Sequence, residues 1–330
     1  MSIAAYIKVI GRGKEGARSL GVGESRDLFE QVLDHKVTDL EIGAFCLAMR
    51  IKGESTEELD GFVQASHARC LDLSAAAAAA PKGIVVLPSY NGARKLPNLT
   101  ALLATELARQ GLGVLVHGPA RDPGRVTTAQ VFEAAGMPLV NNADALAAAW
   151  RSGQAAFMNM ADLCPPMDKL LAVRWTIGLR TPAHSVAKLL DPFAARPPSG
   201  VKSIRVVNHT HPEYAIAMAA FLQHVQANAM LMRGTEGEPV ADARRQPKCD
   251  VFLSGTRVDE LCLAPEEGVL TSLPELPASH SAADTANYIA AILSGQQAMP
   301  SAIQAQANAL VQALARIAAP AAGMGAGLPA

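Results

Sequence analysis

The sequence is poor in aromatic and charged residues. Phenylalanine, tyrosine and tryptophan make up only 4% of its 330 residues, and Asp, Glu, Lys and Arg together make up 18%. So few aromatics argue against a β-sandwich, whereas the abundant alanine favours closely packed helices. Half of the residues are hydrophobic, which allows a large buried core and excludes a disordered chain.

Signals for membranes and for an oxidising compartment are also missing. No apolar run is long enough to cross a bilayer, and the opening "MSIAAYIKVIGRGKEGAR" lacks the apolar core and cleavage site of a signal peptide. The five cysteines form no C-x-x-C pair and no regular spacing. We therefore expect a cytoplasmic protein that does not contact a membrane and whose cysteines are small buried hydrophobes.

Charge is unevenly distributed along the chain. The net charge of −1 predicts no partner, but residues 1–18 and 169–205 are both rich in Lys and Arg. A basic run is usually a solvated face, yet two separated basic segments can meet in a fold as one positive groove.

Hydrophobic periodicity predicts a small helical module followed by an α/β domain. Helices are expected over 24–36, 38–53 and 55–70, with Thr38 and Ser55 at N-terminal caps. The runs "IVVLP" and "LGVLVHG" flank a helix from about residue 98, which is the β-α-β pattern of a parallel sheet. Residues 144–190 are predicted to be helical, and strands resume at "SIRVVNH", "AMLMRG" and "CDVFLSG".

The sequence resembles the anthranilate phosphoribosyltransferase family over nearly its whole length. "IGLRTPAHSVAKLLDPF", "TTAQVFEAAG", "AMLMRGTEG" and "IQAQANALVQAL" carry the resemblance. It implies an α/β protein with a small helical domain (1–73, completed by helices within 165–190) and a large α/β domain (74–164 and 191–319) with a mostly parallel sheet, the fold shared with nucleoside phosphorylases. It also implies a homodimer that pairs through the helical domain. Residues 320–330 are expected to form a flexible tail.

Enzymes of this family transfer phosphoribose from phosphoribosyl pyrophosphate to anthranilate with Mg²⁺, and this sequence departs from their motifs. The glycine-rich pyrophosphate loop falls on "PSYNG" (88–92), where Pro88 and Tyr90 replace glycines. The K-H-G-N-R motif falls on 116–120 and retains only His117 and Gly118, which we expect to keep a structural role. The metal-binding Asp-Glu pair falls on Pro239 and Val240, which cannot bind Mg²⁺; Glu236 and Glu238 nearby are weak replacement candidates.

Positive charge around the expected cleft is retained. Arg174 stands where the family's arginine holds the anthranilate carboxylate, and a guanidinium can equally bind a phosphate. The segments "YNGARKLPNLT", "VLVHGPARDPGRVTT" and "MRGTEGEPV" resemble a second branch of the superfamily, the YbiB-like proteins. That resemblance implies binding of DNA or RNA with little sequence preference, no catalysis and no cofactor.

The candidate phosphate-binding residues lie on three parts of the chain. They are Lys8, Arg12 and Lys14 of the small domain; Arg94, Lys95, Asn98, Thr100, Arg121 and Arg125 of the altered loops; and Lys169, Arg174, Lys202 and Arg205, expected around the cleft. Two alternatives stay open. One is an active phosphoribosyltransferase or nucleoside phosphorylase that uses Mg²⁺ and phosphoribosyl pyrophosphate. The other is a scaffold with no nucleic-acid role.

Overall fold

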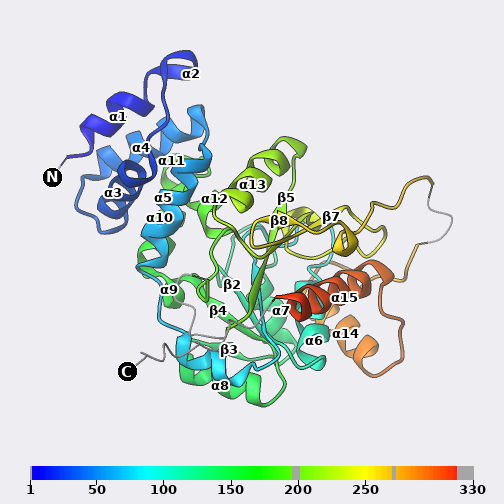
Figure 1. Ribbon diagram of the computed structural model, residues 1–330. Coiled ribbons are helices and arrows are strands. Elements are labelled where there is room, and N and C mark those ends of the chain that lie inside the picture. The colour runs from blue at the N-terminus through cyan, green and yellow to red at the C-terminus, as the bar shows by residue number, and fades with distance from the viewer. Residues whose placement is uncertain (1, 195–200, 270–272, 318–330) are drawn as a thin grey trace, which may run out of the picture.

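A computed structural model describes residues 2–194, 201–269 and 273–317, so the tail expected over 320–330 lies outside the described residues. The chain forms a small helical domain beside a large α/β domain, as predicted (Figure 1). The elements of the helical domain are α1 (Ala4–Ile10), α2 (Gly13–Gly16), α3 (Val22–Leu33), α4 (Asp39–Lys52) and α5 (Thr56–His67).

The predicted helix caps of the small domain are confirmed. The Thr38 and Ser55 side chains accept hydrogen bonds from the amides of Glu41 and Glu58, and both glutamates reach back to complete capping boxes. Phe29 of α3 stacks on Phe62 of α5, with ring centroids 4.5 Å apart. These contacts hold the helical bundle together, and its apolar residues belong to the same core as one face of the sheet.

In the part of the chain that the structure describes, eight strands form the sheet of the large domain, in the order β3-β4-β2-β1-β5-β6-β7-β8. The first six in that order run parallel, and β7 and β8 are antiparallel. Their bounds are β1 Ile84–Pro88, β2 Gly113–Gly118, β3 Leu139–Val140, β4 Ala156–Asn159, β5 Ser203–His209, β6 Ala229–Arg233, β7 Cys249–Leu253 and β8 Thr256–Arg257. The sheet is therefore mostly parallel, as expected.

Helices cover both faces of this sheet. Because side chains alternate along a strand, Val85 and Leu87 pack with one set of helices, whereas Ile84 and Val86 pack with the other. The first set is α6 (Thr100–Arg109), α7 (Thr128–Ala134), α14 (Ala282–Leu293) and α15 (Ser301–Arg316). The second includes α8 (Ala143–Arg151), α13 (Pro212–His224), the 3₁₀ turn η1 (Ser74–Ala79) and the helical domain (Figure 1).

Four short helices connect the two domains: α9 (Met160–Leu163), α10 (Pro165–Ala172), α11 (Arg174–Ile177) and α12 (Ala183–Ala187). Among them α10 contacts α3, and α12 contacts α5. The segment 165–190 therefore packs on the helical bundle, although it follows the first half of the sheet in sequence.

Two details differ from the sequence-based expectations. The segment 144–190, which was predicted to be helical, contains β4, an inner strand of only four residues. The sequence did not reveal this strand, because a short strand buried on both faces shows no polar alternation. Of the cysteines, Cys70 and Cys262 are half-buried, and only Cys46, Cys164 and Cys249 lie in the core. Within the described residues, no helix is both long and apolar enough to span a membrane.

Candidate functional site

The candidate site lies where the carboxyl ends of β1, β2, β5 and β6 meet. The chain leaves β1 toward β2 on one side, whereas β5 and β6 extend the sheet on the other, so the order reverses beside β1. Ligands of open α/β sheets bind at such a reversal. Four loops meet here: 89–99 after β1, 119–127 after β2, 210–211 after β5 and 234–248 after β6.

The loop after β1 forms an anion cradle, and the carboxylate of Glu238 fills it. Glu238 Oε1 accepts hydrogen bonds from the amides of Asn91 at 2.7 Å and Gly92 at 2.6 Å. Its Oε2 accepts from the hydroxyls of Ser89 and, at 3.3 Å, Thr128. Glu238 is 1% exposed, so solvent anions cannot compete with it. The position that aligns with the family's pyrophosphate loop thus already holds a carboxylate of the same chain.

A second carboxylate extends this arrangement. Glu236 Oε2 accepts hydrogen bonds from three successive amides, those of Arg94 at 2.7 Å, Lys95 at 3.0 Å and Leu96 at 3.2 Å. The turn depends on Gly237, whose φ is 85° and where a Cβ would collide with the Asn91 side chain. We define the acceptor pair Glu236 and Glu238, with the amides of residues 91, 92 and 94–96, as the filled cradle.

The residues present do not fit the Mg²⁺ that the family's chemistry requires. The positions of the metal-binding acids hold Pro239 and Val240, as the sequence indicates. Glu236 and Glu238, the replacement candidates, face N–H and O–H donors, which take the lone pairs that a cation would need. Within the described ranges, no three His, Cys, Asp or Glu side chains are arranged to hold a metal ion.

Below the cradle, His117 is buried in β2. Its Nδ1 lies 2.7 Å from the Tyr90 hydroxyl, and its Nε2 lies 3.4 Å from the Leu190 carbonyl oxygen. Burial lowers the pKa of His117 to about 4, so the ring is neutral at pH 7. This geometry supports the structural role expected for His117.

Buried histidines should make stability fall in mild acid. Burial lowers the pKa of His117 to about 4 and the pKa values of His67 and His184 to about 3, so protons bind these rings only in the unfolded chain near pH 6. Glu54 has the opposite effect on stability, because burial raises its pKa to about 7, so that the folded chain holds a proton that the unfolded chain releases. The three histidines and Glu54 together let the unfolded chain bind two more protons than the folded chain. The free energy of unfolding should therefore drop by up to about 3 kcal/mol per pH unit between pH 6.5 and 5. Urea unfolding across that range measures the slope; a flat profile would contradict it.

Beside the cradle, five cations lie near one another, and three of them, Arg50, Arg180 and Lys188, line the cleft between the domains. Burial, and then the neighbouring charges of Arg174 and Arg125, lower the pKa of Arg180, with a smaller effect of Arg50. Burial also lowers the pKa of Lys188 to about 8, and its Nζ donates to Asn208 Oδ1 at 3.0 Å and to the Gly237 carbonyl oxygen at 3.3 Å. We call Arg50, Arg125, Arg174, Arg180 and Lys188 the basic cluster.

The cleft beside this cluster is a cavity of about 400 Å³ between the helical bundle and the large domain. Arg50 and Glu54 line it from the bundle, and Arg180, His184 and Lys188 line it from the connecting helices. Sequence reasoning did not single out Arg50, Arg180 or Lys188 for the site. They come from two separate segments, α4 and the chain around α12, which meet only in the folded protein, at this cavity.

Several sequence candidates do lie at this edge. Arg94 and Lys95 are exposed on the loop after β1, and Arg121 is exposed after β2, where it pairs with Glu133 at 2.6 Å. Arg125 is half-buried and donates to the Gly92 carbonyl oxygen at 3.4 Å. Arg174 lies 3.7 Å from Asp122 and stacks over the exposed Trp175 ring. These residues join the basic cluster to the rim of the cradle.

Other candidate phosphate-binding residues are buried or lie away from the cleft, which corrects the site expected from the sequence. Arg205 is 4% exposed inside β5, where its guanidinium donates to the Leu189 carbonyl oxygen. Lys202 precedes β5 and lies at the amino edge of the sheet, on the order of 20 Å from the site along a seven-residue strand. Asn98 and Thr100 are buried, and Asn98 Oδ1 accepts from the Thr100 amide at 3.2 Å. None of these four presents a group to a polyanion at the cleft.

The candidates of the small domain are peripheral in a single subunit. Lys8 and Arg12 are exposed on α1 and at the start of α2, at the outer end of the bundle (Figure 1). The side chain of Lys14 lies outside the described residues. Lys169 is exposed on α10, on the bundle side of the cleft.

With fold and site defined, the chain belongs to the glycosyl transferase family that combines a helical bundle domain with an a/b domain. The bundle domain matches residues 4–70, and the a/b domain matches residues 92–325. This confirms the superfamily of anthranilate phosphoribosyltransferases predicted from the motifs.

Two relatives illustrate the range of similarity. The uncharacterized protein YbiB of Escherichia coli is 38% identical, over 93% of this chain and 92% of that protein. The anthranilate phosphoribosyltransferase of Caldicellulosiruptor saccharolyticus is 21% identical, over 84% and 80%.

Solved structures show the same fold. The anthranilate phosphoribosyltransferase of Thermus thermophilus superposes with a TM-score of 0.65 at 19% identity, covering 94% of this chain and 92% of that one. The enzyme of Saccharomyces cerevisiae, in complex with PRPP and Mg, gives 0.63 at 15% identity, with 94% and 85% covered.

Proposed function

We propose that this protein is a catalytically inactive relative of the phosphoribosyltransferases that binds DNA or RNA with little sequence preference. The observation that carries the proposal is the basic cluster at the cleft. Like charges held together are unfavourable unless an anion neutralises them, and clusters of this kind attract polyanions. Arg94, Lys95 and Arg121 extend the positive surface beyond the cleft, as a nucleic-acid backbone would require.

The filled cradle supports the loss of catalysis. Transfer of phosphoribose needs backbone amides free for pyrophosphate and carboxylates free for a metal. Here the amides of residues 91 and 92 are bound to Glu238 and those of residues 94–96 to Glu236, so the same contacts engage both carboxylates. The contacts between the two glutamates and these amides remove both requirements. The proposed function therefore involves neither phosphoribosyl pyrophosphate nor Mg²⁺.

Homodimerisation through the helical bundle belongs to the same proposal. Leu40, Leu47 and Ile51 lie on one face of α4 and are 83%, 48% and 56% exposed. Gly43 is on this face too, and a Cβ there would meet no atom of the chain. An apolar helix face with a glycine allows close approach of a second helix, and pairing of two bundles would cover it. Two subunits would then present two basic clusters to one strand.

A charge on this α4 face should dissociate the dimer. Leu47→Glu would bury a carboxylate without a partner, which should raise the dimer dissociation constant at least about 100-fold. Analytical ultracentrifugation measures it, with Leu139→Glu as control, because Leu139 is 52% exposed on β3. Wild-type protein that sediments as a monomer, or a Leu47→Glu variant that stays dimeric, would contradict this interface.

Binding itself is tested by fluorescence anisotropy with mixed-sequence oligonucleotides of DNA and RNA. If about five cations contact phosphates, the logarithm of affinity should fall with that of salt concentration with a slope of about −3.5 to −4.5. Different sequences of equal length should bind about equally, because phosphates carry no sequence information. No binding at low salt would favour a scaffold without a nucleic-acid role.

A further inference from the structure

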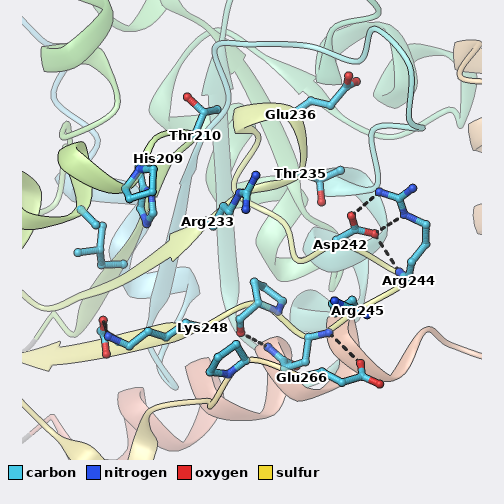
Figure 2. A pocket seen from close by; sticks show the side chains of 18 of the residues that line it. His209, Thr210, Arg233, Thr235, Glu236, Asp242, Arg244, Arg245, Lys248 and Glu266 are labelled. Atoms are coloured by element: carbon cyan, nitrogen blue, oxygen red, sulfur yellow. Dashed lines mark hydrogen bonds and ion pairs between the residues drawn. The ribbon is translucent and has the colours of Figure 1, made fainter. Parts of the chain in front are cut away.

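A second and larger cavity opens beyond the filled cradle, on the side of β6 and β7. It has a volume of about 860 Å³ and lies between the carboxyl end of β6, the start of α13 and the segment 242–250 (Figure 2). It shares His209 and Thr210 with the cleft of the basic cluster, which lies on the other side of these residues. The basic cluster itself does not line it.

The acidic side chains that line this cavity already have partners. Asp242 pairs with Arg244 through both carboxylate oxygens, at 2.9 and 2.7 Å. Asp250 pairs with Lys248 and Arg257, each at 2.9 Å. Glu236 holds three amides of the cradle, as described above. Glu266 accepts a hydrogen bond from the Gln246 amide at 3.3 Å. Each of these acids therefore already has a partner within the chain.

Arg244 and Lys248 on its walls pair with these acids, whereas other basic groups of the lining are not matched in the same way. Arg233 is exposed at the end of β6, beside its register neighbour His209, and Figure 2 shows it between His209 and Thr235. Among the described residues, the Arg233 side chain makes no hydrogen bond or ion pair. His209 Nδ1 and Arg245 Nε are buried polar atoms without a hydrogen-bond partner in the same part of the chain. Unpaired buried donors of this kind are rare and costly unless a ligand completes them.

The rest of the lining is apolar. Leu231 lies on the floor, and Ala215, Ile216 and Ala219 of α13 line one wall. Ile216 is 78% exposed, although it faces a concave surface where a ligand could cover it. Cavities of several hundred Å³ with apolar walls and a few directed polar groups are typical of small-molecule sites.

We propose that this cavity is a second ligand site, which takes a phosphomonoester carried on a flat apolar ring, such as a nucleoside monophosphate. Arg233 and His209 bind the phosphate, because a guanidinium offers two parallel N–H donors that match phosphate oxygens. The ring lies against Ile216 and Ala219. The same chemistry is found in a free nucleotide and in the 5′-phosphorylated end of a nucleic-acid strand.

The probe is adenosine 5′-monophosphate, titrated by calorimetry into Arg125→Glu/Arg180→Glu protein, in which binding at the basic cluster is suppressed. Saturable binding is expected, and Arg233→Gln in that background should weaken it at least about ten-fold by removing a charge-assisted contact. Ala215→Trp, which fills the cavity without changing charge, should weaken it as well. Arg316→Gln, which pairs with Glu260 outside the cavity, should leave affinity unchanged.

Competition then identifies the source of the phosphomonoester. Displacement by a 5′-phosphorylated oligonucleotide but not by its 5′-hydroxyl counterpart would point to strand ends, whereas displacement by neither would point to free nucleotides; both results support the site. No saturable binding of the monophosphate, or equal binding by the Arg233→Gln and Ala215→Trp variants, would overturn the proposal. Either result would leave oligonucleotide binding at the basic cluster unaffected, so the two proposals fail separately.

Discussion

Replacing Arg125 and Arg180 together by glutamate should lower oligonucleotide affinity on the order of 100-fold at 0.1 M salt. Each phosphate contact contributes about 0.9 to the slope of log affinity against log salt concentration. One contact therefore raises the affinity at 0.1 M salt nearly ten-fold relative to 1 M, and two contacts raise it on the order of 100-fold. The slope should become shallower by about two. Both residues belong to the basic cluster, in which burial and then the charges of Arg174 and Arg125 lower the pKa of Arg180. Anisotropy titrations of wild type and variant at several salt concentrations measure both quantities.

A matched control separates local contacts from net charge. Lys202→Glu with Arg109→Glu changes the net charge by the same amount, but both residues lie at the amino edge of the sheet, since α6 runs back toward it and ends at Arg109. This variant should retain most of the affinity. Equal losses in the two variants would mean that only the overall field matters and that the cluster is not the binding site.

Replacing Glu238 by alanine should both destabilise the protein and create an anion site. The amides of Asn91 and Gly92 and the hydroxyl of Ser89 would lose their buried acceptor. At about 1 kcal/mol or more for each unsatisfied buried donor, the loss should reach about 3 kcal/mol. Inorganic pyrophosphate should then raise the melting temperature of the variant and leave that of wild type unchanged, because only the variant has an empty cradle.

Glu260→Ala serves as the control, because Glu260 is exposed and pairs only at the surface with Arg316. If the Glu238→Ala protein does not fold, Glu236→Ala opens the amides of residues 94–96 alone and allows the same measurement. Pyrophosphate that stabilises wild type as strongly as the variant would contradict the filled cradle.

Much of the fold could be predicted because local signals and global packing agree. Thr38 and Ser55 cap their helices as the sequence indicates, and "IVVLP" is β1. The strand β4 could not be recognised, because three of its four residues are buried and it lacks the alternation that marks a half-exposed strand. Short inner strands are defined by their neighbours in the sheet more than by their own residues.

The site was predicted less well than the fold, for a related reason. Motif comparison placed Arg174 around the cleft and Arg125 on an altered loop, and both lie close enough to Arg180 to lower its pKa, after the larger effect of burial. It placed Arg205 and Lys202 around the cleft too, although burial in β5 and the direction of that strand exclude both. The roles of Glu238 and Lys188 depend on contacts across about 150 and 20 residues of sequence. Such contacts exist only once the loops have docked.

The central claim is that polyanion binding has replaced catalysis at this cleft. The most direct test is calorimetry on one wild-type preparation, titrated with a mixed-sequence oligonucleotide at low salt and, separately, with phosphoribosyl pyrophosphate and Mg²⁺. We expect a clear oligonucleotide isotherm that weakens steeply as salt is added, and no heat of binding from phosphoribosyl pyrophosphate. A saturable, magnesium-dependent isotherm with phosphoribosyl pyrophosphate, together with no oligonucleotide binding, would contradict the claim and identify an active transferase.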